Sequence, residues 1–346
     1  MSSVPGISAE AQAAIPSGDA NPAAPKKRNL ALDGLKYFAA CSIVLHHVAA
    51  RTGTPLGNFL VSAMVWALVF FFAVAGYLHG ATGTRGAAWL KKRFVRLAIP
   101  YAFFSLVYLF IQQPAALARG NLVLPNIYRL VFFSGAHGIM WTLPVLFYCA
   151  VAAEVGARTP LWRRILLVVC VVLLCALDWS PRLQALTTTF GIQNFWYAPR
   201  WFAAYLAGME FRAAGRMKRP PVPIQLLVPL SILGAGALRI YGAVLPPWLA
   251  TSASTLMWAT TVGVLLWGAA AEFSWWGADK LAWGGNFLIG IYLTHVIWLD
   301  LFQSKVPLTA MPDAAWIASA WLFCFVMATA ATIALRSNRF TRMLVA

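Results

Sequence analysis

The sequence predicts an all-α, polytopic membrane protein in which about ten transmembrane helices form a single bundle. Of its 346 residues, 61% are apolar and only 11% are charged, whereas soluble domains carry about a quarter charged residues. The mean hydropathy is +0.71, and apolar segments recur from about residue 33 to residue 335 without a soluble insert. We therefore expect one membrane-embedded domain over residues 29–346.

Residues 1–28 are rich in Ala, Pro and Ser and contain no aromatic side chain. Because such a segment lacks the side chains to bury a core, we expect a disordered cytosolic tail, which ends in Lys26, Lys27 and Arg28. The first apolar run begins only after Asp33 and continues as a full span. This pattern predicts no cleavable signal peptide and a first helix that anchors the chain.

Ten apolar windows are long enough to cross about 30 Å of hydrocarbon at about 1.5 Å per residue. The predicted helices cover 33–50, 58–81, 95–112, 139–157, 162–179, 193–211, 222–241, 248–271, 283–302 and 314–335. Pro and Gly residues interrupt segment 113–138, which we expect to be a lid or re-entrant loop with a short amphipathic helix. An eleventh crossing in this segment is the alternative.

The positions of the basic residues that give the formal charge of +17 indicate the membrane topology. With the N-terminus inside, most Lys and Arg residues near helix ends fall on the cytoplasmic side, in groups at 26–28, 85–96, 212–219 and 336–342. Both termini are then cytoplasmic, and the charge requires no nucleic acid partner. The pattern fits a multi-pass protein of a bacterial inner membrane.

The five cysteines lie in apolar runs, without a CxxC spacing and without a histidine at metal-ligand distance in the sequence. These residues are Cys41, Cys149, Cys170, Cys175 and Cys324. We therefore expect neither a disulfide framework nor a zinc site, and no metal in the mechanism.

Three polar residues share one stripe of the first predicted helix. Asp33 and Lys36 are three residues apart and are expected to pair, and His47 lies eleven residues after Lys36, about 16 Å along the axis. His46 points about 100° away from His47. The alternatives are that Asp33 and Lys36 only cap the helix, and that the histidine only bonds a neighbouring helix. A buried imidazole on a charged face otherwise suits a general base.

A second group of cations lies at the start of the third predicted helix. Arg93 and Arg96 are one turn apart, and Lys92 and Arg96 are spaced i, i+4. Such a cluster suits the phosphate groups of coenzyme A, which would reach it from the cytosol. Its alternative is a topological anchor that binds lipid headgroups.

Five stretches together resemble membrane-bound acyltransferase family three, integral proteins that O-acylate sugars. They are 32–36 followed by His47, 70–78, 93–96, 141–146 and 291–295. The chain departs from the family pattern at three positions: Lys36 replaces the commoner Arg, Ala75 stands where Ser is frequent, and Leu146 replaces a Glu. Lys36 therefore lacks the planar fork for two parallel hydrogen bonds, and no carboxylate acts at position 146.

Four further residues are candidates for binding the acceptor substrate on the outer side: His295, Arg200, Trp141 and His46. His295 is expected at a depth comparable with that of His47. The alternatives are a satisfied interhelical hydrogen bond for His295, a structural pair for Arg200, and a place in the interfacial aromatic belt for Trp141. His79 and Glu154 are expected to be interfacial residues.

The resemblance implies transfer of an acyl group from cytosolic acyl-CoA to a hydroxyl of a carbohydrate or lipid-linked sugar. In this hypothesis Arg93 and Arg96 bind the phosphates with Lys36 nearby, Asp33 orients Lys36, and His47 acts as general base or carries the acyl group transiently. Acetyl is the default acyl group, and the sequence leaves longer chains open. There are two alternatives: a secondary transporter with a buried His/Arg relay, and an inactive scaffold. The sequence has no detectable internal repeat, which argues against the transporter.

Overall fold

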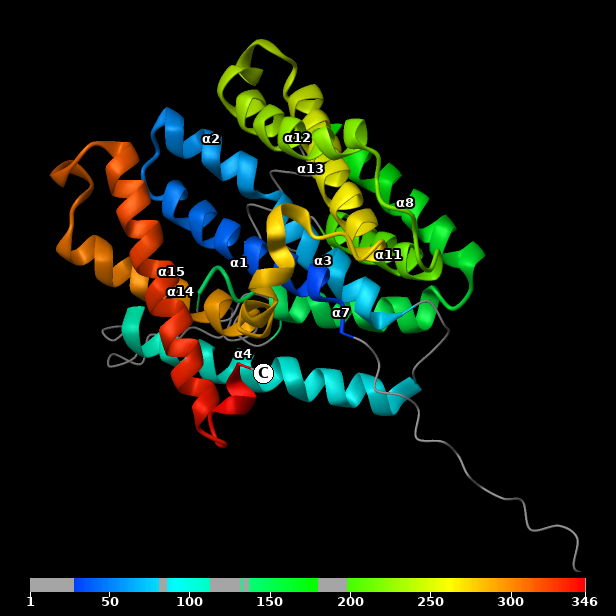
Figure 1. The fold of residues 1–346 in the computed structure, drawn as a ribbon, viewed down its shortest axis with the longest axis horizontal. Coiled ribbons are helices and arrows are strands. Elements are labelled where there is room, and N and C mark those ends of the chain that lie inside the picture. Colours follow the sequence, from blue (N-terminus) through cyan, green and yellow to red (C-terminus); the bar gives the residue numbers. More distant parts are fainter. Residues whose placement is uncertain (1–27, 81–85, 113–131, 133–136, 180–197, 346) are drawn as a thin grey trace, which may run out of the picture.

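The chain folds as a bundle of helices, shown in Figure 1. The structure is a computed structural model, and it describes residues 28–80, 86–112, 132, 137–179 and 198–345. Within these ranges there is no β-strand. Apart from Arg28, the predicted N-terminal tail lies outside the described residues, and so does most of the predicted lid 113–138.

Eleven α-helices lie within the described ranges. The α-helices are α1 (Leu30–Ala50), α2 (Pro55–Met64), α3 (Trp66–His79), α4 (Gly86–Gln112), α7 (Thr142–Gly156), α8 (Pro160–Trp179), α11 (Ala198–Ala213), α12 (Val222–Tyr241), α13 (Pro247–Ala270), α14 (Leu288–Lys305) and α15 (Asp313–Ser337). Four short 3₁₀ segments accompany them: η2 (Gly242–Val244), η3 (Trp275–Asn286), η4 (Leu308–Ala310) and η5 (Arg342–Leu344).

Each of the ten predicted segments overlaps at least one of these helices. Three segments differ clearly from the prediction. Segment 58–81 is two helices, α2 and α3, that meet at Val65, and α2 begins early because Thr54 caps its first turn, where Pro55 fits. Helix α4 begins nine residues before the predicted 95, at Gly86. The ninth segment bends by 81° between η3 and α14.

Several helices are long and apolar enough to cross a membrane, as expected for a multi-pass protein. These are the α2–α3 pair, α4, α12, α13 and α15, and the bent pair of η3 and α14 makes a sixth if it counts as one span. The remaining predicted spans, the total of ten and the cytoplasmic position of both termini stay predictions.

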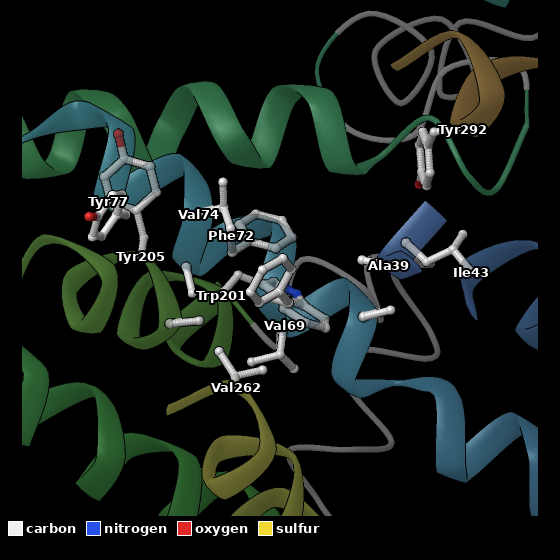
Figure 2. Packing of buried hydrophobic residues seen from close by; sticks show 14 of the residues in the cluster. Ala39, Ile43, Val69, Phe72, Val74, Tyr77, Trp201, Tyr205, Val262 and Tyr292 are labelled. Carbon is white, nitrogen blue, oxygen red and sulfur yellow. The ribbon is translucent and has the colours of Figure 1, made fainter. Parts of the chain in front are cut away.

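Helices α3 and α11 pack backbone against backbone through two glycines. A Cβ on Gly76 of α3 would lie 1.8 Å from the carbonyl oxygen of Tyr205, and a Cβ on Gly208 of α11 would lie 1.8 Å from that of Ala73. Small residues at such crossings let membrane helices approach closely. Around this crossing Phe72 stacks on Trp141 and Trp201, with ring centroids 6.1 and 5.1 Å away, in the core that Figure 2 shows.

Segment η3 packs equally closely on the start of α1. A Cβ on Gly34 would lie 1.7 Å from the carbonyl oxygen of Ala278, and a Cβ on Gly285 would lie 2.4 Å from that of Asp33. Asn29 caps α1 by accepting from the Leu32 amide at 2.9 Å, and it donates to the carbonyl of Ala269 at 2.7 Å. The start of α1 is therefore held against the segment that leads into α14.

Placing a methyl group in the α3–α11 contact is expected to destabilise the protein. Gly76→Ala should lower the free energy of unfolding by about 1–3 kcal/mol, the usual cost of overpacking, because the backbone carbonyl of Tyr205 has no room to move. Thermal unfolding in detergent or nanodiscs measures the change. Gly263→Ala in α13 is the matched control, since a Cβ there meets nothing within 4 Å, and a melting temperature equally low in both variants would contradict the prediction.

Candidate functional site

Four histidines gather where α1, α14 and the start of α7 approach one another. The ring centroid of His47 lies 5.0 Å from that of His295 and 5.1 Å from that of His46. His137 is within electrostatic range of both His47 and His295. Residues about 250 positions apart in the sequence thus form one imidazole cluster, centred on His47.

His295 is held in one orientation by its own helix. The side chain is completely buried, and its Nδ1 lies 2.7 Å from the carbonyl oxygen of Tyr292 and 3.2 Å from that of Ile291. A carbonyl oxygen has no proton to donate, so in the neutral ring Nδ1 carries the proton and Nε2 is an acceptor. This Nε2 is buried and has no hydrogen-bond partner in the described part of the chain.

His47 is less constrained by hydrogen bonds than His46 and His295. Its side chain is partly accessible, and within the described ranges it makes no hydrogen bond. His46, in contrast, has its Nδ1 2.8 Å from the carbonyl oxygen of Val61 in α2. An imidazole with free nitrogen atoms beside a second neutral imidazole is able to accept and return a proton.

Beyond the imidazole cluster lies a polar rim that the sequence analysis did not include. Arg51, directly after α1, pairs with Asp300 of α14 at 2.6 Å. Tyr108 stacks on His137 with centroids 4.8 Å apart and donates to the carbonyl of Leu293 at 2.9 Å. Burial lowers the pKa of His137, and the charge of Asp300 partly offsets this shift.

A basic cavity of about 420 Å³ opens between α1, α3, α4, α7 and α14. Among the described residues, five cations and no carboxylate line it. The cations come from α1, from α4 and from the C-terminal segment of α15 and η5: Lys36, Arg93, Arg96, Arg336 and Arg342. The Nε of Arg93 is buried without a hydrogen-bond partner among the described residues. Partly desolvated guanidinium groups favour an anionic ligand, above all one with phosphate groups.

Asp33 fixes the cations at the start of α1. Its carboxylate is buried and forms ion pairs with both Lys36 and Arg28. Arg28 also donates to the carbonyl of Ala282 in η3 at 3.0 Å. The expected pair of Asp33 and Lys36 is therefore present, and it belongs to the same contact that seats η3 on α1.

Tyr292 connects the basic cavity with the imidazole cluster. Its ring lines the inner end of the cavity and lies 6.0 Å from the ring of His295. The hydroxyl accepts from Thr142 at 2.9 Å and donates to the carbonyl of Ile139 at 2.6 Å. Figure 2 shows this side chain pointing toward the part of α1 that carries Ala39 and Ile43.

The structure brings some of the predicted site residues together and leaves others apart. Lys36, Arg93 and Arg96 share the basic cavity, and Asp33 borders it through Lys36, whereas Lys92 is exposed and does not line it. His47 and His295 face each other.

Arg200 and Trp141 do not reach this site in the structure. Arg200 donates to Thr255 at 3.2 Å and lies over the ring of Trp258, 5.5 Å from its centroid. Trp141 is buried in the aromatic stack with Phe72 rather than open to a sugar.

His79 and Glu154 are buried inside the protein and contact each other; their interfacial depth stays a prediction. His79 lies 2.9 Å from the Glu154 carboxylate through Nε2 and 2.7 Å from the hydroxyl of Tyr205 through Nδ1. This network joins α3, α7 and α11, so both residues have a structural role that a search along one helix does not reveal.

Sequence reasoning missed Arg336 and Arg342 as members of the site because it treated them only as a topology signal. Arg336, at the end of α15, donates to the carbonyl of Asn286, and its guanidinium lies 5.4 Å from the ring centroid of Phe287. Arg342 lies in η5, which packs on α4, and the neighbouring Leu344 and Val345 are buried. The C-terminal segment therefore closes one side of the basic cavity.

No group of three or more His, Cys, Asp or Glu side chains in the described ranges has an arrangement that could hold a metal ion. The described side chains of the site are imidazoles, a buried tyrosine and cations, which suit binding of a phosphorylated ligand and proton transfer about 16 Å further along α1.

A comparison with protein families finds a match to a family described as an acyltransferase domain, over residues 29–336. The matched range contains the imidazole cluster and all cations of the basic cavity except Arg342. Searches of curated proteins and of solved structures find no match.

Removing the charge of Asp33 is expected to loosen the start of α1. Asp33→Asn leaves Lys36 and Arg28 without their partner, and the free energy of unfolding should fall by about 2 kcal/mol, between the values typical of surface and buried ion pairs. Thermal unfolding measures the loss. Asp313→Asn at the exposed start of α15 is the control, and an unchanged melting temperature for Asp33→Asn would contradict the anchoring role.

Proposed function

Because the chain belongs to acyltransferase family three, we propose that it transfers an acyl group from cytosolic acyl-CoA to a hydroxyl of a carbohydrate or lipid-linked sugar. In this proposal the basic cavity binds the donor, and His47 is the general base. The protein acts in the bacterial inner membrane, with the basic cavity open to the cytoplasm.

The strongest support for an acyl-CoA donor is the basic cavity itself. Five cations without a lining carboxylate match a ligand with several phosphate groups, and the unpaired, buried Nε of Arg93 requires an acceptor. Lipid headgroups are a weaker match, because the cavity continues inward to Tyr292 and Thr142. A ligand with phosphate groups and a long flexible arm matches this cavity, because the phosphates can contact the cations while the arm extends to Tyr292 and Thr142.

The reacting thioester is proposed to lie beyond Tyr292, next to His47. Lys36 at the cavity and His47 share one stripe of α1, and Tyr292 lies between the cavity and His295. The acceptor hydroxyl approaches from the other side, past the Arg51–Asp300 pair and His137, whose polar groups suit a carbohydrate.

The proposed step is direct transfer. His47 takes the proton of the acceptor hydroxyl as its oxygen attacks the thioester carbonyl carbon. A new C–O bond forms, the C–S bond breaks, and the proton passes from His47 to the leaving thiolate of coenzyme A. His295 acts as a positioning residue, because its fixed ring limits how the ring of His47 is able to turn.

Loss of the His47 imidazole is expected to separate binding from turnover. His47→Ala in nanodiscs should bind acetyl-CoA with a Kd within about threefold of wild type, because the phosphate-binding cations are intact. Its release of free CoA should fall about 10²–10⁴-fold, the range for a lost general base. If this variant turns over at the wild-type rate, the assigned base is wrong. Radiolabel from the acyl group retained on wild-type protein would favour an acyl-histidine over direct transfer.

Loss of the cavity cations is expected to weaken donor binding instead. Each of Arg93→Ala and Arg336→Ala should raise the Kd for CoA about tenfold to a hundredfold, the value of one or two charge-assisted hydrogen bonds. Isothermal titration with CoA measures the change, and Lys91→Ala, an exposed position of α4 outside the cavity, is the control. If wild type binds no acyl-CoA, and transport responds to an ion gradient, the transporter alternative replaces the enzyme.

A further inference from the structure

A second cavity of about 570 Å³ runs along the outside of α4 and α7. Its walls are almost entirely apolar, and we call it the apolar groove. It is lined by Phe94, Leu97, Ala98, Tyr101, Ala102, Ser105, Leu106, Leu109, Phe132, Leu143, Pro144, Phe147 and Tyr148. Phe94, Leu106 and Phe132 are more than half or about half exposed, so one side of the groove is open.

The apolar groove borders the proposed donor site. Leu97 of α4 and Leu143 of α7 line both the groove and the basic cavity. Leu143 follows Thr142, whose hydroxyl donates to Tyr292 at the inner end of the basic cavity. The groove therefore borders the cavity in two places. Leu143 lies at the end where the acyl group would lie, and Leu97 directly follows Arg96, one of the cations that bind the phosphates in the proposal.

We propose that the apolar groove binds the hydrocarbon chain of the acyl donor, so that the preferred substrates are acyl-CoA molecules with medium or long chains rather than acetyl-CoA. This inference rests on the proposed function. The donor is an amphiphile with an anionic head and an apolar tail, and the two neighbouring cavities have the same division: five cations line one, and carbon atoms line most of the other.

The hydrophobic effect predicts how affinity should depend on chain length. Each methylene group transferred from water to an apolar site contributes up to about fourfold in affinity. Because one side of the groove is open, the protein encloses only part of a bound acyl chain. For octanoyl-CoA we expect at least a tenfold gain in affinity over acetyl-CoA.

Filling the groove tests the proposal. Ala98 and Ala102 are one turn apart on α4, and both line the groove. Ala102 is exposed, so Ala102→Phe is expected to fold and to obstruct the chain. Ala88→Phe, an exposed position of the same helix that lines neither cavity, is the matched control.

The measurement is the Kd of full-length protein in nanodiscs for acetyl-CoA and for octanoyl-CoA. We expect similar acetyl-CoA affinity in all three proteins, and a tenfold or larger gain for octanoyl-CoA in wild type and Ala88→Phe that is lost in Ala102→Phe. An equal gain in Ala102→Phe, or no gain in wild type, overturns the groove proposal while acetyl-CoA binding sustains the donor site. Failure of wild type to bind either donor overturns the proposed function itself.

Photolabelling distinguishes the acyl chain from an ordinary bilayer lipid in the groove. An acyl-CoA with a diazirine at the end of its chain should label peptides of α4 and α7, and excess octanoyl-CoA should abolish the labelling. A phospholipid with a diazirine in its tail is the second probe. If it labels the same peptides, and octanoyl-CoA does not displace it, the groove holds a bilayer lipid and the proposal is wrong.

Discussion

The contact between segment η3 and the first turns of α1 is the constraint on which the site depends. Gly34 lies against the backbone of Ala278, and Gly285 lies against that of Asp33, with no space for a Cβ at either position. Since η3 leads through an 81° bend into α14, this contact determines where α14 begins and therefore where its side chains face. Through it, His295 reaches His47, and Lys36 reaches the basic cavity.

In this protein, structural residues and candidate functional residues differ in whether their polar atoms have hydrogen-bond partners. His79 has both ring nitrogens engaged, by Glu154 and Tyr205, in a network that joins three helices. Within the described ranges, by contrast, His47 makes no hydrogen bond, and His295 Nε2 and Arg93 Nε have no partner. Because an unpaired buried polar atom is costly, such atoms concentrate where a ligand completes the site.

The two neighbouring cavities match the two chemically different parts of the proposed donor. Cations from α1, α4, α15 and η5 collect around one cavity, and apolar side chains of α4 and α7 form the other. Helix α4 contributes to both, with Arg93 and Arg96 beside the groove residues Phe94 and Leu97. A single helix is thereby able to set the position of an anionic head relative to an apolar chain.

The sequence by itself determined what depends on composition and on a single helix. Apolar windows predicted the helices, and the i, i+3 spacing predicted the Asp33–Lys36 pair, because helix geometry fixes both within one segment. The stretches from 32–36 to 291–295 indicated the acyltransferase family, which the match over 29–336 confirms.

Only the tertiary structure decided which distant segments meet. It paired His47 with His295, brought Arg336 and Arg342 to the basic cavity, and turned Trp141 into the core. These outcomes follow from backbone contacts at glycines and from the bend before α14, and both depend on the surface of another helix. The hydrophobic period of one segment carries no information about that partner, since in a membrane every helix is apolar on most of its surface.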